Sequence, residues 1–81
     1  MSVLKSLEQL PVGASGRVER LEGGFGFLQH VQDLGLRVGQ MLRKVQHAGS
    51  GPILIEFESQ VVAVGRGIAH RIIVEELRDG G

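Results

Sequence analysis

The chain has 81 residues, 42% of them apolar, and its nine basic residues balance nine acidic ones. This length allows a single domain, residues 1–81, with one modest core that we place at about residues 10–77. Zero net charge argues against nucleic acid as a partner, and the absence of cysteine excludes disulfides, thiolate metal sites and a cysteine nucleophile. No apolar run reaches the roughly 18 residues that cross a bilayer, so we expect a cytoplasmic protein without membrane insertion.

The chain has thirteen glycines, which are scattered along it and not clustered. This distribution predicts short strands joined by tight turns. The first predicted strand covers residues 16–21. Side chains alternate along a strand, so Val18 and Leu21 can share one face only if the strand contains a bulge or ends early.

A short helix follows the first strand. Phe27, Val31 and Leu34 have the spacing of one helical face, with Leu28 beside them. Gly35 stands where a helix takes its left-handed cap, so we expect the helix to end there after two to three turns. A helix this short depends on packing more than on its own propensity.

The second half of the chain predicts strands. Ile53, Ile55 and Phe57 alternate with polar residues, as do Ile72 and Val74, which is typical of half-buried strands. The expected elements are strands at about 40–46, 53–58, 60–64 and 71–75, a single 3₁₀ turn at 68–70, and a fraying tail at 79–81. Five short strands with one helix between the first two predict a mainly β fold, a small five-stranded barrel.

Four stretches of the chain, in sequence order, resemble a known family. Gly23-Gly24-Phe25-Gly26 and then Leu34-Gly35-Leu36-Arg37-Val38-Gly39 are similar to its glycine turn and to the stretch that follows its helix. Gly51-Pro52-Ile53 resembles its loop-to-strand junction, and residues 62–74 resemble its closing signature. Together, from about Leu10 to Val74, they resemble the FeoA family.

This resemblance implies an SH3-like barrel in the cytoplasm. It also implies a non-enzymatic accessory role in bacterial ferrous-iron transport, docking on and modulating the cytoplasmic region of the FeoB transporter. The same barrel resembles the C-terminal domain of iron-dependent repressors, so the fold alone does not decide the role. A free-standing transition-metal-binding or metal-sensing module is therefore the alternative.

Three residues are the candidates for partner binding. If side chains alternate after the helix cap, Leu34, Leu36 and Val38 cannot all face inward. Leu36 with Arg37 is therefore expected to form an exposed contact, an aliphatic side chain beside a charge. Arg66, between two glycines at a corner, could reach an acidic partner or a nucleotide phosphate, or could simply be a solvated turn residue. Lys44 stands where the family usually has an apolar residue. We expect Lys44 to lie on the polar face of its strand, and we expect the same of Arg17 and Arg20 in the first strand.

No metal ligand and no catalytic residue are predicted. His30, His47 and His70 are expected on three different elements, without the spacing of a metal site. Weak Fe²⁺ or Zn²⁺ binding and self-association stay open. The sequence has no Ser-His-Asp order and no evident acid–base pair, so we expect no enzyme.

Overall fold

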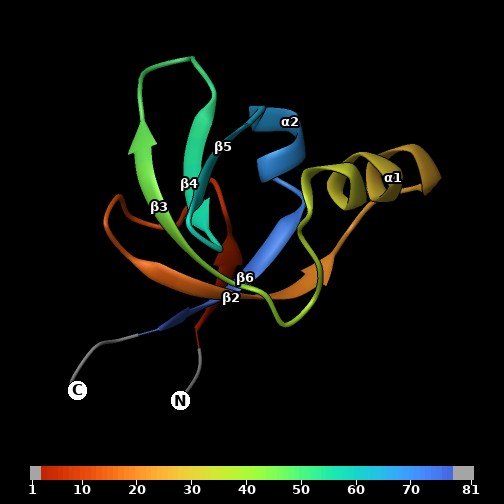
Figure 1. Cartoon of the computed structure of the whole chain (residues 1–81), viewed down its shortest axis with the longest axis horizontal. Coiled ribbons are helices and arrows are strands. Elements are labelled where there is room, and N and C mark those ends of the chain that lie inside the picture. Colours follow the sequence, from red (N-terminus) through yellow and green to blue (C-terminus); the bar gives the residue numbers. More distant parts are fainter. Residues whose placement is uncertain (1–2, 78–81) are drawn as a thin grey trace.

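The computed structural model describes residues 3–77, which form one six-stranded antiparallel sheet and two helices (Figure 1). The helices are α1 (Phe25–Leu34) and α2 (Arg66–Ala69). The strands are β1 (Leu4–Ser6), β2 (Ser15–Leu21), β3 (Met41–His47), β4 (Ile53–Phe57), β5 (Gln60–Val64) and β6 (Ile72–Leu77). Residues 79–81, which were expected to fray, lie outside the described part of the chain.

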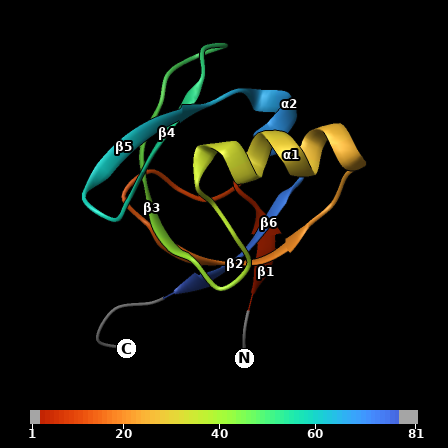
Figure 2. The same ribbon diagram turned by 45° about the vertical axis from the view of Figure 1, so that its right-hand side comes forward.

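The strand order is β1-β6-β2-β3-β4-β5, and every neighbouring pair is antiparallel. The sheet curls on itself, and α1 and α2 lie beside each other over one side of it (Figures 1 and 2). This arrangement confirms the predicted mainly β, SH3-like barrel. It also confirms the short helix between the first two predicted strands, which are β2 and β3 in the structure. The structure adds a sixth strand, β1, whose three residues show no alternation and pair with residues 73–75 far along the chain.

A bulge in β2 resolves the conflict between Val18 and Leu21. The pairing of β2 with β6 shifts register between Val18 and Arg20, so that Glu19 is an additional residue on the β2 side. Val18 is fully buried, and Leu21 packs against the same core. The bulge is one of the two solutions that the sequence allowed.

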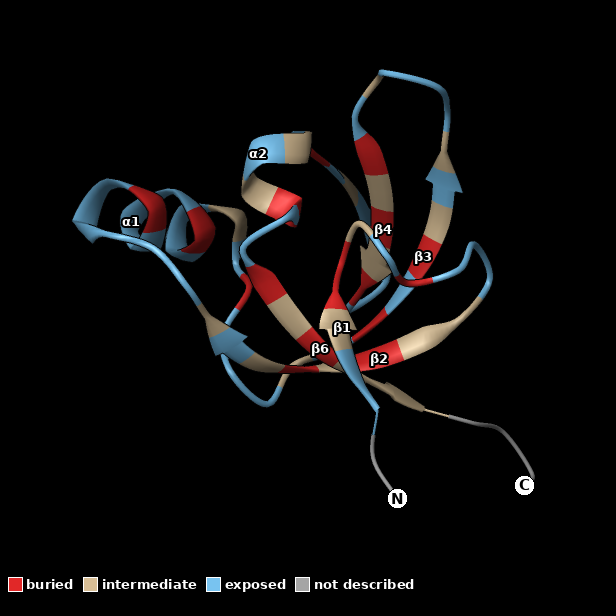
Figure 3. Cartoon of the chain, turned by 180° about the vertical axis from the view of Figure 1, so that it is seen from behind, coloured by how far each residue is buried: buried red, intermediate tan, exposed pale blue. Residues whose placement is uncertain are grey.

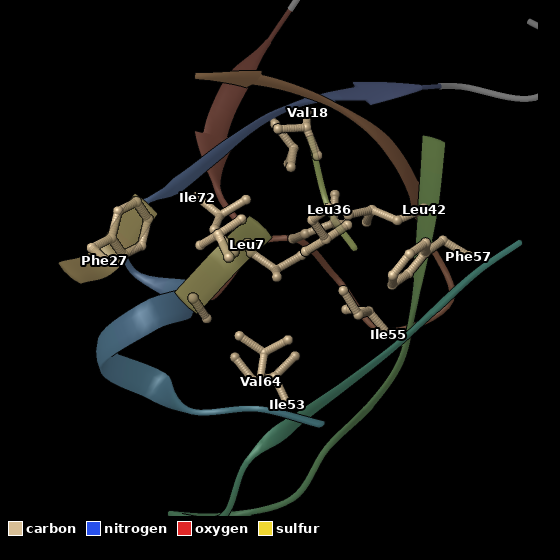
Figure 4. Packing of buried hydrophobic residues seen from close by; sticks show 14 residues of the cluster. Leu7, Val18, Phe27, Leu36, Leu42, Ile53, Ile55, Phe57, Val64 and Ile72 are labelled. Atoms are coloured by element: carbon tan, nitrogen blue, oxygen red, sulfur yellow. The ribbon is translucent and has the colours of Figure 1, made fainter. Parts of the chain in front are cut away.

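The core lies inside the curled sheet and beneath the two helices (Figures 3 and 4). As expected, Ile53, Ile55 and Phe57 point inward from β4, and Ile72 and Val74 are fully buried on β6. The turn after β1 contributes Leu7 and Leu10, and the helices contribute Phe27, Val31 and Ala69. Burial of a large aliphatic side chain stabilises the fold by about 1.5–3 kcal/mol, so this cluster holds the helices on the sheet.

The helix α1 begins at Phe25 and ends at Leu34, with Gly35 as its left-handed cap at φ 93°, as predicted. Its buried residues are Phe27 and Val31, whereas Leu28 points to solvent, so the buried face is narrower than the sequence suggested. In place of the expected 3₁₀ turn at 68–70, residues 66–69 form one α-helical turn, because Ala69 N–H bonds the Gly65 carbonyl and His70 N–H bonds the Arg66 carbonyl.

Gly23 is required by the packing of the helix start. A Cβ atom at this position would lie 2.4–2.8 Å from the Cδ2, Cγ and Cβ atoms of Phe27, which is buried in the core. We therefore expect Gly23→Ala to lower the free energy of unfolding by about 1–3 kcal/mol, the cost of forcing a core side chain aside. Urea unfolding followed by far-UV circular dichroism measures this.

Gly26→Ala is the matched control, since a Cβ there meets nothing within 4 Å. Gly26 lies in the first turn of α1, so the added methyl group should raise stability by up to about 1 kcal/mol. Equal effects of the two substitutions would contradict the assignment of Gly23 to a packing role.

Candidate partner-binding surface

A groove runs between α1, the segment that follows it and the end of β2. Its volume is about 400 Å³, and we call it the α1 groove; it is lined by Leu21, Leu28, Gln32, Gly35, Leu36, Arg37 and Val38. Phe25 is 83% exposed and lies one helical turn before Leu28, so it extends the apolar rim along α1. This surface combines aliphatic and aromatic side chains with a single charge.

The backbone after α1 is held by two turns. Gly35 N–H donates to the Gln32 carbonyl (2.9 Å) and Leu36 N–H to the Val31 carbonyl (3.2 Å), the bonds of a Schellman motif. A β-turn over residues 37–40 follows, with Gln40 N–H on the Arg37 carbonyl and Gly39 at φ 94°. Gly39 N–H also donates to the Val18 carbonyl at 2.7 Å, which ties this turn to β2.

These two turns correct the expectation for Leu36. The segment is a cap followed by a turn and not an extended strand, so alternation does not decide which side chains face outward. Leu36 is 3% exposed and lies beside Leu42 in the core (Figure 4), whereas Val38, at the second position of the turn, is 60% exposed. Arg37 is exposed, as expected. The exposed aliphatic side chain beside Arg37 is therefore that of Val38.

Arg66 does not line the α1 groove. Its Nε donates to the Gly51 carbonyl (3.2 Å), and its guanidinium lies 3.6 Å from the Glu8 carboxylate. The side chain is only partly exposed. Arg66 thus joins the loop before β4 to the turn after β1.

Lys44 was expected on a polar face and is instead fully buried. It alternates with Arg43 along β3, so it points inward on the same side as Leu42. Its ammonium donates to the Glu8 carbonyl at 2.8 Å and to the Leu7 carbonyl at 3.3 Å. Burial, and then the nearby Arg66 charge, lower the pKa of Lys44, while Glu8 opposes this shift.

The three histidines stay on separate elements. His30 is on α1, His47 ends β3, and His70 follows α2 with its Nδ1 4.0 Å from the Glu8 carboxylate. Partial desolvation, and then the charges of Lys44 and Arg66, lower the pKa of His47. Within residues 3–77, no three His, Asp or Glu side chains form a group that could hold a metal ion.

Neither of the helices in the described chain is long and apolar enough to cross a membrane. The sequence model of the FeoA domain matches residues 5–76. The chain belongs to the FeoA family. It is 31% identical over 64 residues to an Fe(2+) transport protein A of Methanocaldococcus jannaschii, a match that covers 79% of this chain and 77% of the relative.

Solved structures agree with the FeoA assignment. A crystal structure of FeoA, described as an iron uptake regulatory protein, has a TM-score of 0.85 at 28% identity over 93% of this chain and 99% of that one. A manganese-dependent transcriptional repressor has a TM-score of 0.84 at 23% identity, over 95% of this chain and 44% of the repressor. The likeness to the repressor shows the shared fold alone.

Because Lys44 is buried, the free energy of unfolding should vary with pH in the alkaline range. Its pKa is lowered in the native protein, so between that pKa and the ordinary value of 10.5 the unfolded chain binds more protons than the native one. The free energy of unfolding should therefore rise with pH through this window, by at most about 1.4 kcal/mol per pH unit. We expect Lys44→Met to abolish this rise, measured by urea unfolding between about pH 7 and pH 11.

Few other side chains titrate in this pH window, because the chain has no tyrosine and no cysteine and its one other lysine is Lys5. Lys5→Met is the matched control: Lys5 is partly exposed and paired with Glu76, so its removal should keep the rise. Parallel pH profiles for the wild type and Lys44→Met would contradict the assignment.

Proposed function

We propose that this FeoA-family protein is a non-enzymatic accessory of ferrous-iron transport that works in the cytoplasm. In this proposal it docks through the α1 groove on the cytoplasmic region of a FeoB-type transporter and modulates its activity. The observation that carries the proposal is the α1 groove itself, a preformed hollow with both apolar and polar lining on a domain of the FeoA family.

The chemistry of the groove suits a protein partner. Phe25, Leu28 and Val38 place large apolar side chains at the surface without burying them in this chain's own core. Arg37 adds one charge beside them, and a partner with an aliphatic side chain next to a carboxylate would complement it. Exposed apolar side chains that gather around a hollow are more informative than the same side chains scattered singly.

The size of the domain limits the strength of the contact. A surface formed by one helix and one turn is smaller than a standard protein–protein interface, so the affinity should be modest and the complex reversible. Such a contact suits regulation of the transporter's nucleotide cycle, where binding has to respond to the state of the partner. In this proposal the partly exposed Arg66 side chain contributes at the edge of the contact.

Val38→Lys tests the docking surface. The substitution places a charge at an exposed position of the groove, so it should leave the fold intact and weaken binding to the cytoplasmic domain of the cognate FeoB about tenfold or more. Isothermal titration, with and without guanine nucleotide, measures this. Val12→Lys is the control, because Val12 is 57% exposed, close to the 60% of Val38, and does not line the groove.

Two results would reject the docking proposal. One is no binding of the wild-type protein to the transporter, either to its cytoplasmic domain or to the whole transporter in detergent and in lipid. The other is equal binding by Val38→Lys and the wild type. Leu36→Ala is unsuitable for this test, because Leu36 belongs to the core and its truncation would destabilise the fold by about 2–5 kcal/mol.

A further inference from the structure

A second bulge, in β3, places His47 on the inner side of the sheet. The pairing of β3 with β4 shifts register after Lys44, so that Val45 is an additional residue on β3. Lys44 then lies opposite Ile55, and His47 lies opposite Ile53. Side chains that face each other across two strands point to the same side of the sheet. Both isoleucines are fully buried, so His47 points to the same inner side as Lys44.

Arg66 adds a further basic side chain to this part of the molecule. The loop of residues 48–52 follows His47 and joins β3 to β4 (Figure 1). Gly51 N–H donates to the Ala48 carbonyl at 2.8 Å, which closes a turn within the loop. The Gly51 carbonyl accepts the 3.2 Å bond from Arg66 Nε. His47 therefore begins the loop that Arg66 holds from α2.

A single carboxylate contacts these basic side chains within residues 3–77. The Glu8 carboxylate lies 3.6 Å from the Arg66 guanidinium and 4.0 Å from Nδ1 of His70. The Glu8 carbonyl accepts the 2.8 Å bond from the Lys44 ammonium. Two cations and one anion thus surround His47, with His70 beside the anion. Partial desolvation, and then the charges of Lys44 and Arg66, lower the pKa of His47, while Glu8 opposes this shift.

We propose that His47 is an acid-sensitive switch for the loop of residues 48–52. The neutral imidazole allows the loop to stay on Arg66, and protonation of His47 releases it. Lys44 cannot withdraw from an imidazolium, because it is fully buried and two carbonyls hold its ammonium. Arg66 is partly exposed, and the loop residues are exposed or partly exposed. The loop and the guanidinium are therefore the parts that separate.

The direction of the lowered pKa sets the pH range of the switch. Between the native pKa of His47 and the ordinary value of 6.5, the unfolded chain binds more protons than the native one. The stability that neutral His47 contributes is complete above this range and is lost as the pH falls to the native pKa. Release of the loop should follow the native titration of His47, below pH 6.5.

Nuclear magnetic resonance of the whole chain tests the switch. The imidazole signals of His47 should titrate with a midpoint below 6.5 between about pH 7.5 and about pH 4.5. The backbone order parameter of Gly51 should fall with the same midpoint, to below about 0.6. A Gly51 order parameter that stays constant while His47 titrates would overturn the proposal.

Two substitutions assign the response to one histidine. In His47→Gln the Gly51 order parameter should stay constant over the same pH range, which separates His47 from protonation of Glu8. His70→Gln is the matched control, because His70 faces the same carboxylate, and it should keep the wild-type response. A wild-type response in His47→Gln, or loss of the response in His70→Gln, would overturn the assignment to His47.

Lys44→Met tests the repulsion itself. Removal of this neighbouring cation should raise the titration midpoint of His47 towards 6.5 and make the fall in the Gly51 order parameter smaller. An unchanged midpoint would overturn the proposal. If His47→Gln does not fold, the wild type and Lys44→Met remain decisive. Residues 47–52 do not line the α1 groove, so each of these results is independent of transporter docking.

Discussion

The bulge in β2 is the constraint on which the rest of this small domain depends. The strand pairs with β6 along its whole length and with β3 at residues 15–17, so it joins the two halves of the curled sheet. Its bulge allows Val18 and Leu21 to contact one core although they are three positions apart. Val18 also bonds Gln40 and Gly39 through its backbone, which fixes the turn that carries Val38. The position of the α1 groove thus follows from the geometry of this strand.

Much of this fold could be predicted because strand alternation and helical spacing are local signals. The inward residues of β4 and β6 and the left-handed cap at Gly35 were apparent from neighbouring residues, and for β2 the sequence left a bulge or an early strand end as the two solutions. β1 was missed because three residues carry no periodic signal and its pairing partners lie about seventy positions away. Leu36 was placed outside because alternation was applied to a segment that is a cap and a turn.

Lys44 shows a second limit of sequence reasoning. Alternation along β3 places Lys44 on the same inward side as Leu42. A charged side chain is more often exposed, so the two rules give opposite predictions for Lys44. The conflict is settled by the carbonyls of Leu7 and Glu8, which come from a turn that no local pattern connects to β3. A buried cation that donates two hydrogen bonds to carbonyls costs far less than an unpaired one, so the barrel tolerates this lysine at an otherwise apolar position. The candidate surface was predicted only in part for the same reason, since its shape depends on contacts between distant segments.

The place of β6 in the sheet has a consequence for how the chain acquires its structure. β6 lies between β1 and β2 in the sheet, so β1 and β2 do not pair with each other. The two strands are connected through the sheet only when residues 72–77 pair with both of them. A nascent chain therefore holds its early strands without their central partner until synthesis reaches this point. Pairings between such distant segments close large loops, and folding should be cooperative and comparatively slow for a protein of this size.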